Sequence, residues 1–69
     1  MTDHHINVRH SGEDGGYIAD IPDLPGCSAF GDTPEGAVAE VMQAKSAWID
    51  AARAAGKAVP EPRYRPADA

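Results

Sequence analysis

The side chains that could bind a metal or act as a nucleophile are few, and three of them are histidines near the N-terminus. His4 and His5 are neighbours in sequence, so they point to opposite faces of an extended segment, and His10 follows later. No cysteine or carboxylate completes a zinc-binding set with them. Cys27 follows Pro-Gly and has no basic neighbour or helix start of the kind that activates a thiol. We therefore expect no metal, no cofactor and a small, buried Cys27.

Five carboxylates in the middle of the chain are the candidates for metal-dependent nuclease chemistry, because two-metal hydrolysis needs clustered acidic oxygens. They are Asp20, Asp23, Asp32, Glu35 and Glu40. The first predicted strand, residues 4–10, contributes no acidic ligand to such a cluster. A turn explains Asp23, and a helix start explains Asp32 and Glu35. We therefore predict no catalytic residue and keep a residual nuclease only as an alternative function.

Length and composition predict one small domain with a thin core. The chain has 69 residues, and a domain of this size buries only about 60% of the surface that its unfolded chain exposes. Small domains usually need a disulfide, a metal or a partner chain for stability. The single cysteine excludes an internal disulfide. We therefore expect self-association into a dimer or tetramer.

The charge of the chain narrows the class of partner. A net charge of −5 disfavours direct binding of nucleic acid, because phosphates are bound by lysine and arginine. The same charge suits a basic protein partner, and the alternative is that it only keeps the protein soluble. No apolar run approaches the ~20 residues of a membrane span, and the polar N-terminus lacks the apolar region of a signal peptide. We therefore expect a cytoplasmic protein without a membrane partner.

Hydrophobic periodicity predicts three short antiparallel strands. Residues 4–10 alternate, with Ile6 and Val8 on one face, and residues 14–16 suit a hairpin reversal. Residues 17–21 carry apolar side chains on both faces, which favours a central strand. Residues 22–26 form a corner because two prolines and a glycine restrict the backbone. A third strand is expected over residues 27–30.

A long helix follows the third strand. Thr33 is the expected N-cap, Pro34 suits the first helical position, and the pattern continues to Ala55 with Gly56 as the C-terminal cap. One arc of the helix is largely apolar. Its members are Ala37, Val38, Val41, Ala44, Lys45, Trp48, Ile49, Ala52 and Ala55.

The helix is longer than the strands, so its last turns must extend beyond the sheet. About 22 helical residues span ~33 Å, whereas a strand of about six residues spans ~20 Å. The small side chains of Ala51, Ala52 and Ala55 in those turns, together with Lys45 in the apolar arc, are the predicted oligomer interface. The alternatives are that alanine only favours the helix and that Lys45 extends its ammonium outward from the core.

Residues 57–62 read as an extended return strand at a sheet edge, to which Pro60 and Pro62 would confine it. Residues 63–69 are expected to be a flexible tail. These elements predict an α+β domain, β-β-β-α-β, with an antiparallel three-stranded meander, one helix across a face and a short C-terminal edge strand. We expect residues 1–69 to form this single domain.

The stretch from Tyr17 to Thr33 carries a resemblance to a known family. Tyr17-x-Ala-x-Ile-Pro-Asp-Leu-Pro-Gly-Cys is followed by Gly31-Asp-Thr-Pro-Glu-Gly-Ala, and this pattern closely resembles the HicB-like antitoxins. The resemblance covers about residues 5–62 and implies a partial RNase H-like fold without nuclease catalysis. It departs from the family pattern at Gly36 and Lys45, which stand where a glutamate and an aliphatic residue are common.

The resemblance also implies a partner. HicB-like antitoxins of type II toxin–antitoxin pairs bind HicA, a small basic mRNA-cleaving toxin, and occlude its active site. For contact with such a toxin we predict Tyr17, Asp20 and Asp23. Many members carry a C-terminal DNA-binding domain, and we expect none here because only seven residues follow Pro62. The alternative function is a stand-alone oligomeric module with a structural or ligand-related role.

Overall fold

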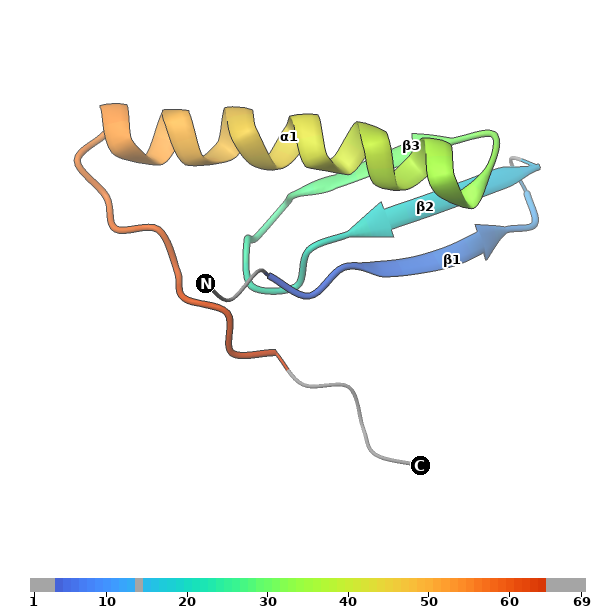
Figure 1. Cartoon of the computed structure of the whole chain (residues 1–69), viewed down its shortest axis with the longest axis horizontal. Helices are drawn as coiled ribbons and strands as arrows, with labels where there is room; N and C mark the ends of the chain where they lie inside the picture. The colour runs from blue at the N-terminus through green and yellow to red at the C-terminus, as the bar shows by residue number, and fades with distance from the viewer. Residues whose placement is uncertain (1–3, 14, 65–69) are drawn as a thin grey trace.

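The computed structural model describes residues 4–13 and 15–64 and has a two-layer α+β architecture. The elements follow in the order β1 (Asn7–Ser11), β2 (Gly16–Asp20), β3 (Ser28–Gly31) and α1 (Pro34–Ala54). The strands form one antiparallel sheet in the order β1-β2-β3, and α1 lies across one face of it (Figure 1). The predicted β-β-β-α arrangement is therefore confirmed.

The hairpin between β1 and β2 forms where the glycines predicted it. Gly15 has a φ of 69°, which glycine adopts without strain, and its N–H donates to the carbonyl oxygen of Ser11 at 3.0 Å. Val8 pairs with Ala19 on the helix side of the sheet, yet Val8 is 40% exposed. Val8 remains this exposed because α1 packs mainly over β2 and β3 and leaves the β1 edge uncovered.

The corner between β2 and β3 is held by its own backbone. The N–H of Leu24 donates to the carbonyl of Ile21, the N–H of Cys27 donates to the carbonyl of Leu24, and both distances are 3.0 Å. Gly26 supplies a φ of 79°. This geometry turns the Leu24 side chain inward, where it is fully buried. The corner therefore closes one end of the core with the Leu24 side chain.

The core lies between the sheet and α1 and is thin. Among the described residues, its largest fully buried side chains are Ile21, Leu24 and Val41. Small residues complete it, among them Ala19, Cys27 and Ala37. Partly buried residues close its margin, namely Ile6, Tyr17, Ala29, Ala44, Trp48 and Val59.

Both ends of α1 follow the predicted capping chemistry. The hydroxyl of Thr33 accepts the N–H of Gly36 at 2.9 Å. At the other end Gly56 has a φ of 70°, its N–H donates to the carbonyl of Arg53, and the N–H of Lys57 donates to that of Ala52. This pair of bonds is a Schellman motif. The helix stops there and, at 21 residues, extends beyond the sheet as predicted (Figure 1).

Gly31 is the point of closest approach between β3 and α1. A Cβ atom built on Gly31 would lie 2.6 Å from the carbonyl carbon of Gly36 and 2.8 Å from the Cα of Ala37. Side-chain atoms do not tolerate such distances, and both neighbours are backbone atoms that cannot rotate away. Glycine at this position therefore allows the first turn of α1 to rest directly on the sheet.

The chain after α1 corrects the prediction of a C-terminal edge strand. In the part of the chain that the structure describes, the sheet has three strands and residues 57–64 are not among them. This segment, which we call the strap, passes the residues before β1 (Figure 1). The ring Nε2 of His4 is hydrogen-bonded to the carbonyl of Pro60 at 2.7 Å. Prolines at 60 and 62 remove two N–H donors, so the strap is held by side chains and does not form a ladder.

No helix within residues 4–13 and 15–64 is long and apolar enough to cross a membrane.

Candidate partner-binding surfaces

The three residues predicted to contact a partner lie on three different parts of the domain. Tyr17 pairs with His10 and Gly31 on the helix side of the sheet, is partly buried, and its ring meets that of His10 edge-on at 5.1 Å between centroids. Asp20 lies on the opposite face of the sheet, and Asp23 lies in the corner. The structure therefore does not assemble them into one site.

Asp20 takes part in an ion pair on the open face of the sheet, the face that α1 leaves uncovered. Its Oδ1 accepts a hydrogen bond from Nη1 of Arg9 at 3.4 Å. Both groups are accessible to water, which weakens the attraction of such a pair to about 0–1 kcal/mol. Asp20 is thus available to exchange Arg9 for a basic group of another molecule.

Asp23 anchors the strap to the corner. Its Oδ2 accepts the backbone N–H groups of Arg63 at 2.9 Å and of Tyr64 at 3.0 Å. The Tyr64 ring lies 4.8 Å from that of His5 between centroids. Arg63 and Tyr64 begin the predicted flexible tail, whose remainder, residues 65–69, lies outside the described residues. Asp23 therefore lies in the turn as predicted, and its side chain also binds a segment about 40 residues later in the chain.

The two N–H groups lower the pKa of Asp23, with smaller contributions of the same sign from His4 and Arg63. A carboxyl with a lowered folded-state pKa stabilises the fold above the ordinary pKa of about 4. That contribution is lost as the pH falls through the lowered, folded-state pKa. Acid therefore weakens the attachment of the strap.

Replacing Asp23 with alanine is expected to detach the strap while leaving the sheet and helix intact. In the wild type, the amide resonances of Arg63 and Tyr64 should titrate with a midpoint below about 4, and in Asp23→Ala this titration should disappear. Asp32→Ala, which removes an exposed carboxylate elsewhere, should leave it unchanged. A titration that persists in Asp23→Ala would show that another group holds the strap.

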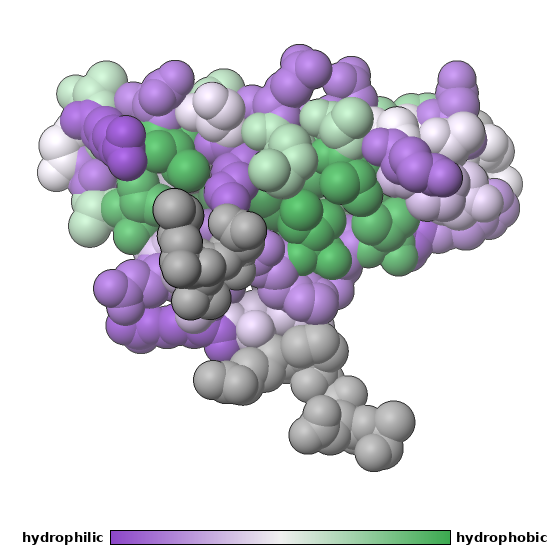
Figure 2. Space-filling view, in the orientation of Figure 1, coloured by the Kyte–Doolittle hydropathy of each residue, from purple (hydrophilic) through white to green (hydrophobic). Residues whose placement is uncertain are grey.

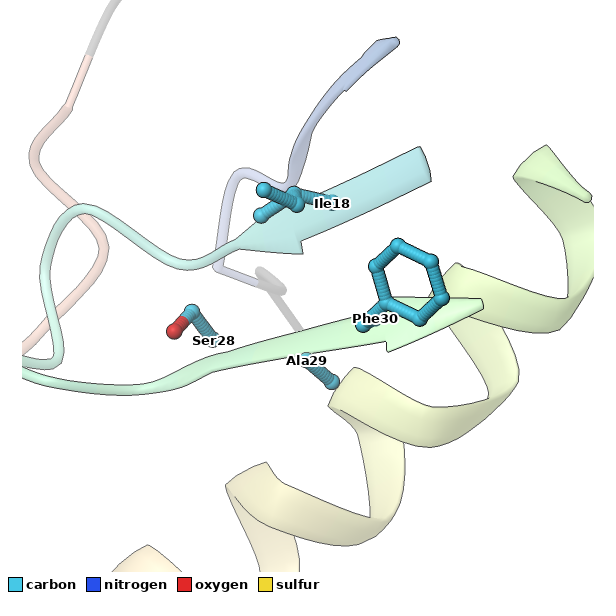
Figure 3. A pocket seen from close by; sticks show the side chains of 4 residues that line it. All are labelled: Ile18, Ser28, Ala29 and Phe30. Atoms are coloured by element: carbon cyan, nitrogen blue, oxygen red, sulfur yellow. The ribbon is translucent and has the colours of Figure 1, made fainter. Parts of the chain in front are cut away.

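The open face carries an apolar depression that the sequence analysis missed. It has a volume of about 600 Å³ and is lined by Ile18, Ser28, Ala29 and Phe30. Figure 3 shows Ile18, Ser28 and Phe30 on this face and Ala29 directed toward α1. Phe30 is 44% exposed, and its ring covers Gly16, where a Cβ would lie 2.8 Å from a ring carbon. The sequence signal for this depression is the apolar character of both faces of β2, which by itself indicates only a central strand.

The overhanging end of α1 forms a second apolar surface. Ala51, Ala52 and Ala55, three of the predicted oligomer residues, line a groove of about 280 Å³. The remaining lining residues are Trp48, Lys57 and Ala58. Figure 2 shows apolar surface beneath these last turns of α1. The structure therefore brings the three alanines together, whereas Lys45 does not line their groove.

Cys27, just before β3, belongs to the buried core, and Lys45 is half-buried on α1. Cys27 is 5% exposed, as predicted for a small buried residue. Burial raises the pKa of its thiol, and the nearby Lys45 ammonium offsets part of that rise. A raised pKa disfavours the nucleophilic thiolate at neutral pH. Among the described residues, no three histidine, cysteine or acidic side chains are grouped to hold a metal ion.

The comparison with known families decides the identity of the domain. A sequence profile described as a HicB-like antitoxin of a bacterial toxin–antitoxin system matches residues 4–65. The chain belongs to the HicB-like antitoxin family. The match includes the strap as well as the three strands and α1, so the strap is part of the family's sequence pattern.

A curated relative of this HicB-like chain is a UPF0150 protein of Synechocystis sp., 38% identical over 47 residues. The alignment covers 68% of this chain and 64% of that protein, so the chain spans under two thirds of the relative's length. No solved structure matches the chain. The partial RNase H-like classification therefore stays a prediction beyond the observed β-β-β-α arrangement.

The residues that carry the HicB-like resemblance mainly have structural roles. Leu24 fills the core, Cys27 packs beside it, and Thr33 caps α1. The carbonyl of Pro25 accepts the indole N–H of Trp48 at 3.0 Å, which ties the corner to the helix. The family pattern thus specifies the scaffold, and partner contacts must be sought on the surfaces that it positions.

Proposed function

We propose that this protein is a non-catalytic antitoxin that neutralises a HicA-type mRNA-cleaving toxin by covering it. Membership of the HicB-like antitoxin family carries the proposal, because the profile match extends over residues 4–65. The net charge of −5 supports a small basic protein as the partner through electrostatic complementarity. Direct contact with nucleic acid is not part of the proposed role.

The proposed toxin contacts begin at Asp20. This carboxylate lies on the open face in a weak ion pair with Arg9, so a toxin arginine or lysine can replace Arg9 without uncovering a buried charge. Asp23 and Tyr17 extend the proposed contacts to the corner and to the helix side of the sheet. Asp23 binds backbone N–H groups through Oδ2, and its other carboxylate oxygen is proposed to meet the toxin.

Self-association accompanies the proposed role. The groove of Ala51, Ala52 and Ala55 is an apolar surface at the overhanging end of α1, and small side chains permit close approach of a second helix. Lys45 is proposed as a separate contact because it lies outside that groove. The alanine groove and Lys45 are therefore two separate proposed contacts.

Co-expression with the neighbouring open reading frame tests the proposed function. If the neighbour encodes a toxin, its induction should arrest growth and degrade mRNA, and this protein should restore growth and co-purify with the toxin. Growth arrest that this protein does not relieve contradicts the proposal. An oligomer that binds no small basic protein favours the stand-alone module, and cleavage of RNA by the purified chain with Mg²⁺ favours the residual nuclease.

Charge reversal at Asp20 tests the proposed contact surface. Asp20→Arg should weaken toxin binding at least tenfold, because it removes one charge-assisted contact of about 1.5–3 kcal/mol and adds repulsion. Glu13→Arg is the matched control, since it changes the net charge equally at an exposed position of the β1–β2 turn. Equal loss of affinity in both variants would indicate general electrostatic attraction and reject Asp20 as a contact.

A further inference from the structure

The strap is attached by side chains from the corner and from the segment before β1. The ring Nε2 of His4 is hydrogen-bonded to the carbonyl of Pro60 at 2.7 Å. The Oδ2 atom of Asp23 accepts two N–H groups of the strap. The Tyr64 ring lies against the His5 ring, with 4.8 Å between their centroids, which is within the range of attractive aromatic pairs. Two residues before β1 therefore contact the strap directly.

The contact between the strap and His5 continues onto the open face of the sheet. The ring Nε2 of His5 is hydrogen-bonded to Oδ1 of Asn7 at 2.7 Å. Asn7 is the register partner of Asp20, and directly opposite residues of two antiparallel strands point to the same side of the sheet as close neighbours. The strap is therefore linked to Asp20 by successive neighbouring side chains. We call them the contact series: Tyr64, His5, Asn7 and Asp20.

The middle of the contact series is partly enclosed although its side chains are polar. His5 and Asn7 are half-buried, whereas Arg9, the next residue of β1 on the open face, is exposed. Holding two side chains in one geometry costs rotamer freedom, so the orientation of Asn7 depends on what restrains His5. The Tyr64 ring supplies that restraint. Detachment of the strap removes the ring, and the Asn7 side chain beside Asp20 then becomes free to rotate.

We propose that the strap is a conformational latch for the Asp20 end of the open face. Its hydrogen bonds lie near the surface and open with low free energy, so an attached and a detached state exchange. The attached state holds His5 and Asn7 in place and fixes the polar groups around Asp20. In the detached state, a basic partner must order these groups at an entropic cost when it binds.

The latch predicts a coupling between the strap and a partner at Asp20. The attached state binds a basic partner more tightly, and by thermodynamic linkage the partner strengthens the attachment of the strap. This coupling rests on the proposed toxin-binding function, whereas the latch itself does not.

The latch is tested on the purified protein alone, with two variants that each remove one attachment. In Asp23→Ala and in His4→Ala, the N–H groups of residues 63 and 64 should exchange with solvent at least fivefold faster. The three-bond couplings that report the χ1 angle of Asn7 should move from single-rotamer values toward rotamer averages. Asp32→Ala, the matched control, should change neither measurement. An Asn7 rotamer that stays fixed while the strap amides exchange faster overturns the proposal.

Two substitutions at Tyr64 test the first step of the contact series. Tyr64→Ala removes the ring from His5 but keeps the backbone N–H bond to Asp23, and it should free the Asn7 rotamer. Tyr64→Phe keeps the ring and should retain the wild-type rotamer. If both variants leave Asn7 fixed, the ring does not transmit the attachment and the contact series is wrong. Circular dichroism checks that all variants remain folded.

The coupling is tested with the toxin found by co-expression. His4→Ala and Tyr64→Ala should each weaken toxin binding about fivefold or more, the lower end of usual couplings between sites, and Tyr64→Phe should bind like the wild type. Toxin should also slow exchange of the strap amides in the wild type. A loss confined to Tyr64→Ala would indicate direct contact of the ring with the toxin and reject the coupling.

Failure of the coupling is distinguishable from failure of the proposed function. Unchanged toxin affinity in both His4→Ala and Tyr64→Ala refutes the coupling, while binding by the wild type upholds the proposed function. A wild type that binds no toxin rejects the proposed function, and the Asn7 rotamer measurements still decide the latch.

Discussion

Replacing Gly31 with alanine should lower the free energy of unfolding by about 3 kcal/mol or more, the upper range for an overpacked site. The added methyl group would lie 2.6 Å from the carbonyl carbon of Gly36, and backbone atoms of α1 cannot move aside as a side chain could. Domains have about 0.05–0.15 kcal/mol of stability per residue, so 69 residues give only a small reserve. We therefore expect Gly31→Ala to be largely unfolded at physiological temperature.

Gly12→Ala provides the control for this prediction. No atom lies within 4 Å of a Cβ built on Gly12, so the substitution should change the free energy of unfolding by no more than about 0.5 kcal/mol. Urea unfolding followed by circular dichroism measures both variants. Similar midpoints for Gly31→Ala and Gly12→Ala would show that α1 can withdraw from β3 at little cost.

Leu24→Ala should have the other large effect, a loss of about 2–5 kcal/mol. Leu24 is fully buried at the corner, and within residues 4–13 and 15–64 it is among the largest side chains that are completely enclosed. Its removal leaves a cavity that the hydrogen-bonded corner cannot close, because the N–H groups of Leu24 and Cys27 hold the backbone in place.

Val8→Ala is a suitable comparison, since Val8 is an aliphatic side chain at the exposed β1 edge. Its loss should lower the free energy of unfolding by less than about 1 kcal/mol, because little apolar area leaves the core. Urea denaturation curves of the two variants give the difference directly. A Leu24→Ala midpoint close to that of Val8→Ala would mean that the corner collapses into the space.

The elements with local signals were predictable from the sequence. Thr33 followed by Pro34 marks the helix start, and Gly56 marks its end, because each acts on backbone groups within a few residues. The glycines around residue 15 likewise determine the hairpin. The burial of Leu24 and Cys27 followed from their place beside a proline corner. These features depend only on residues that are close in the sequence, so they can be predicted from the sequence without knowledge of the fold.

The features that the sequence left undetermined depend on distant partners. Prolines at 60 and 62 allow an extended segment. Whether this segment pairs as a strand or is held as a strap depends on the residues that it contacts in the folded domain. The contact of Asp23 with Arg63 joins residues 40 apart, and the turn role of Asp23 gave no reason to seek it. Ile18 lies between Tyr17 and Ala19 in the sequence, so both faces of β2 carry apolar side chains. Only the packing of α1 decides which face stays open.

The strap also has a consequence for the order in which the structure forms. β3 and α1 are joined by only Asp32 and Thr33 and meet at Gly31, so their contacts close a very short loop. The hydrogen bonds of His4 and Asp23 to the strap join residues 40 to 56 apart, and longer loops cost more entropy to close. The strap contacts consist mainly of hydrogen bonds near the surface, which open with low free energy. We therefore expect the strap to attach last during folding and to detach first, while the rest of the domain stays native.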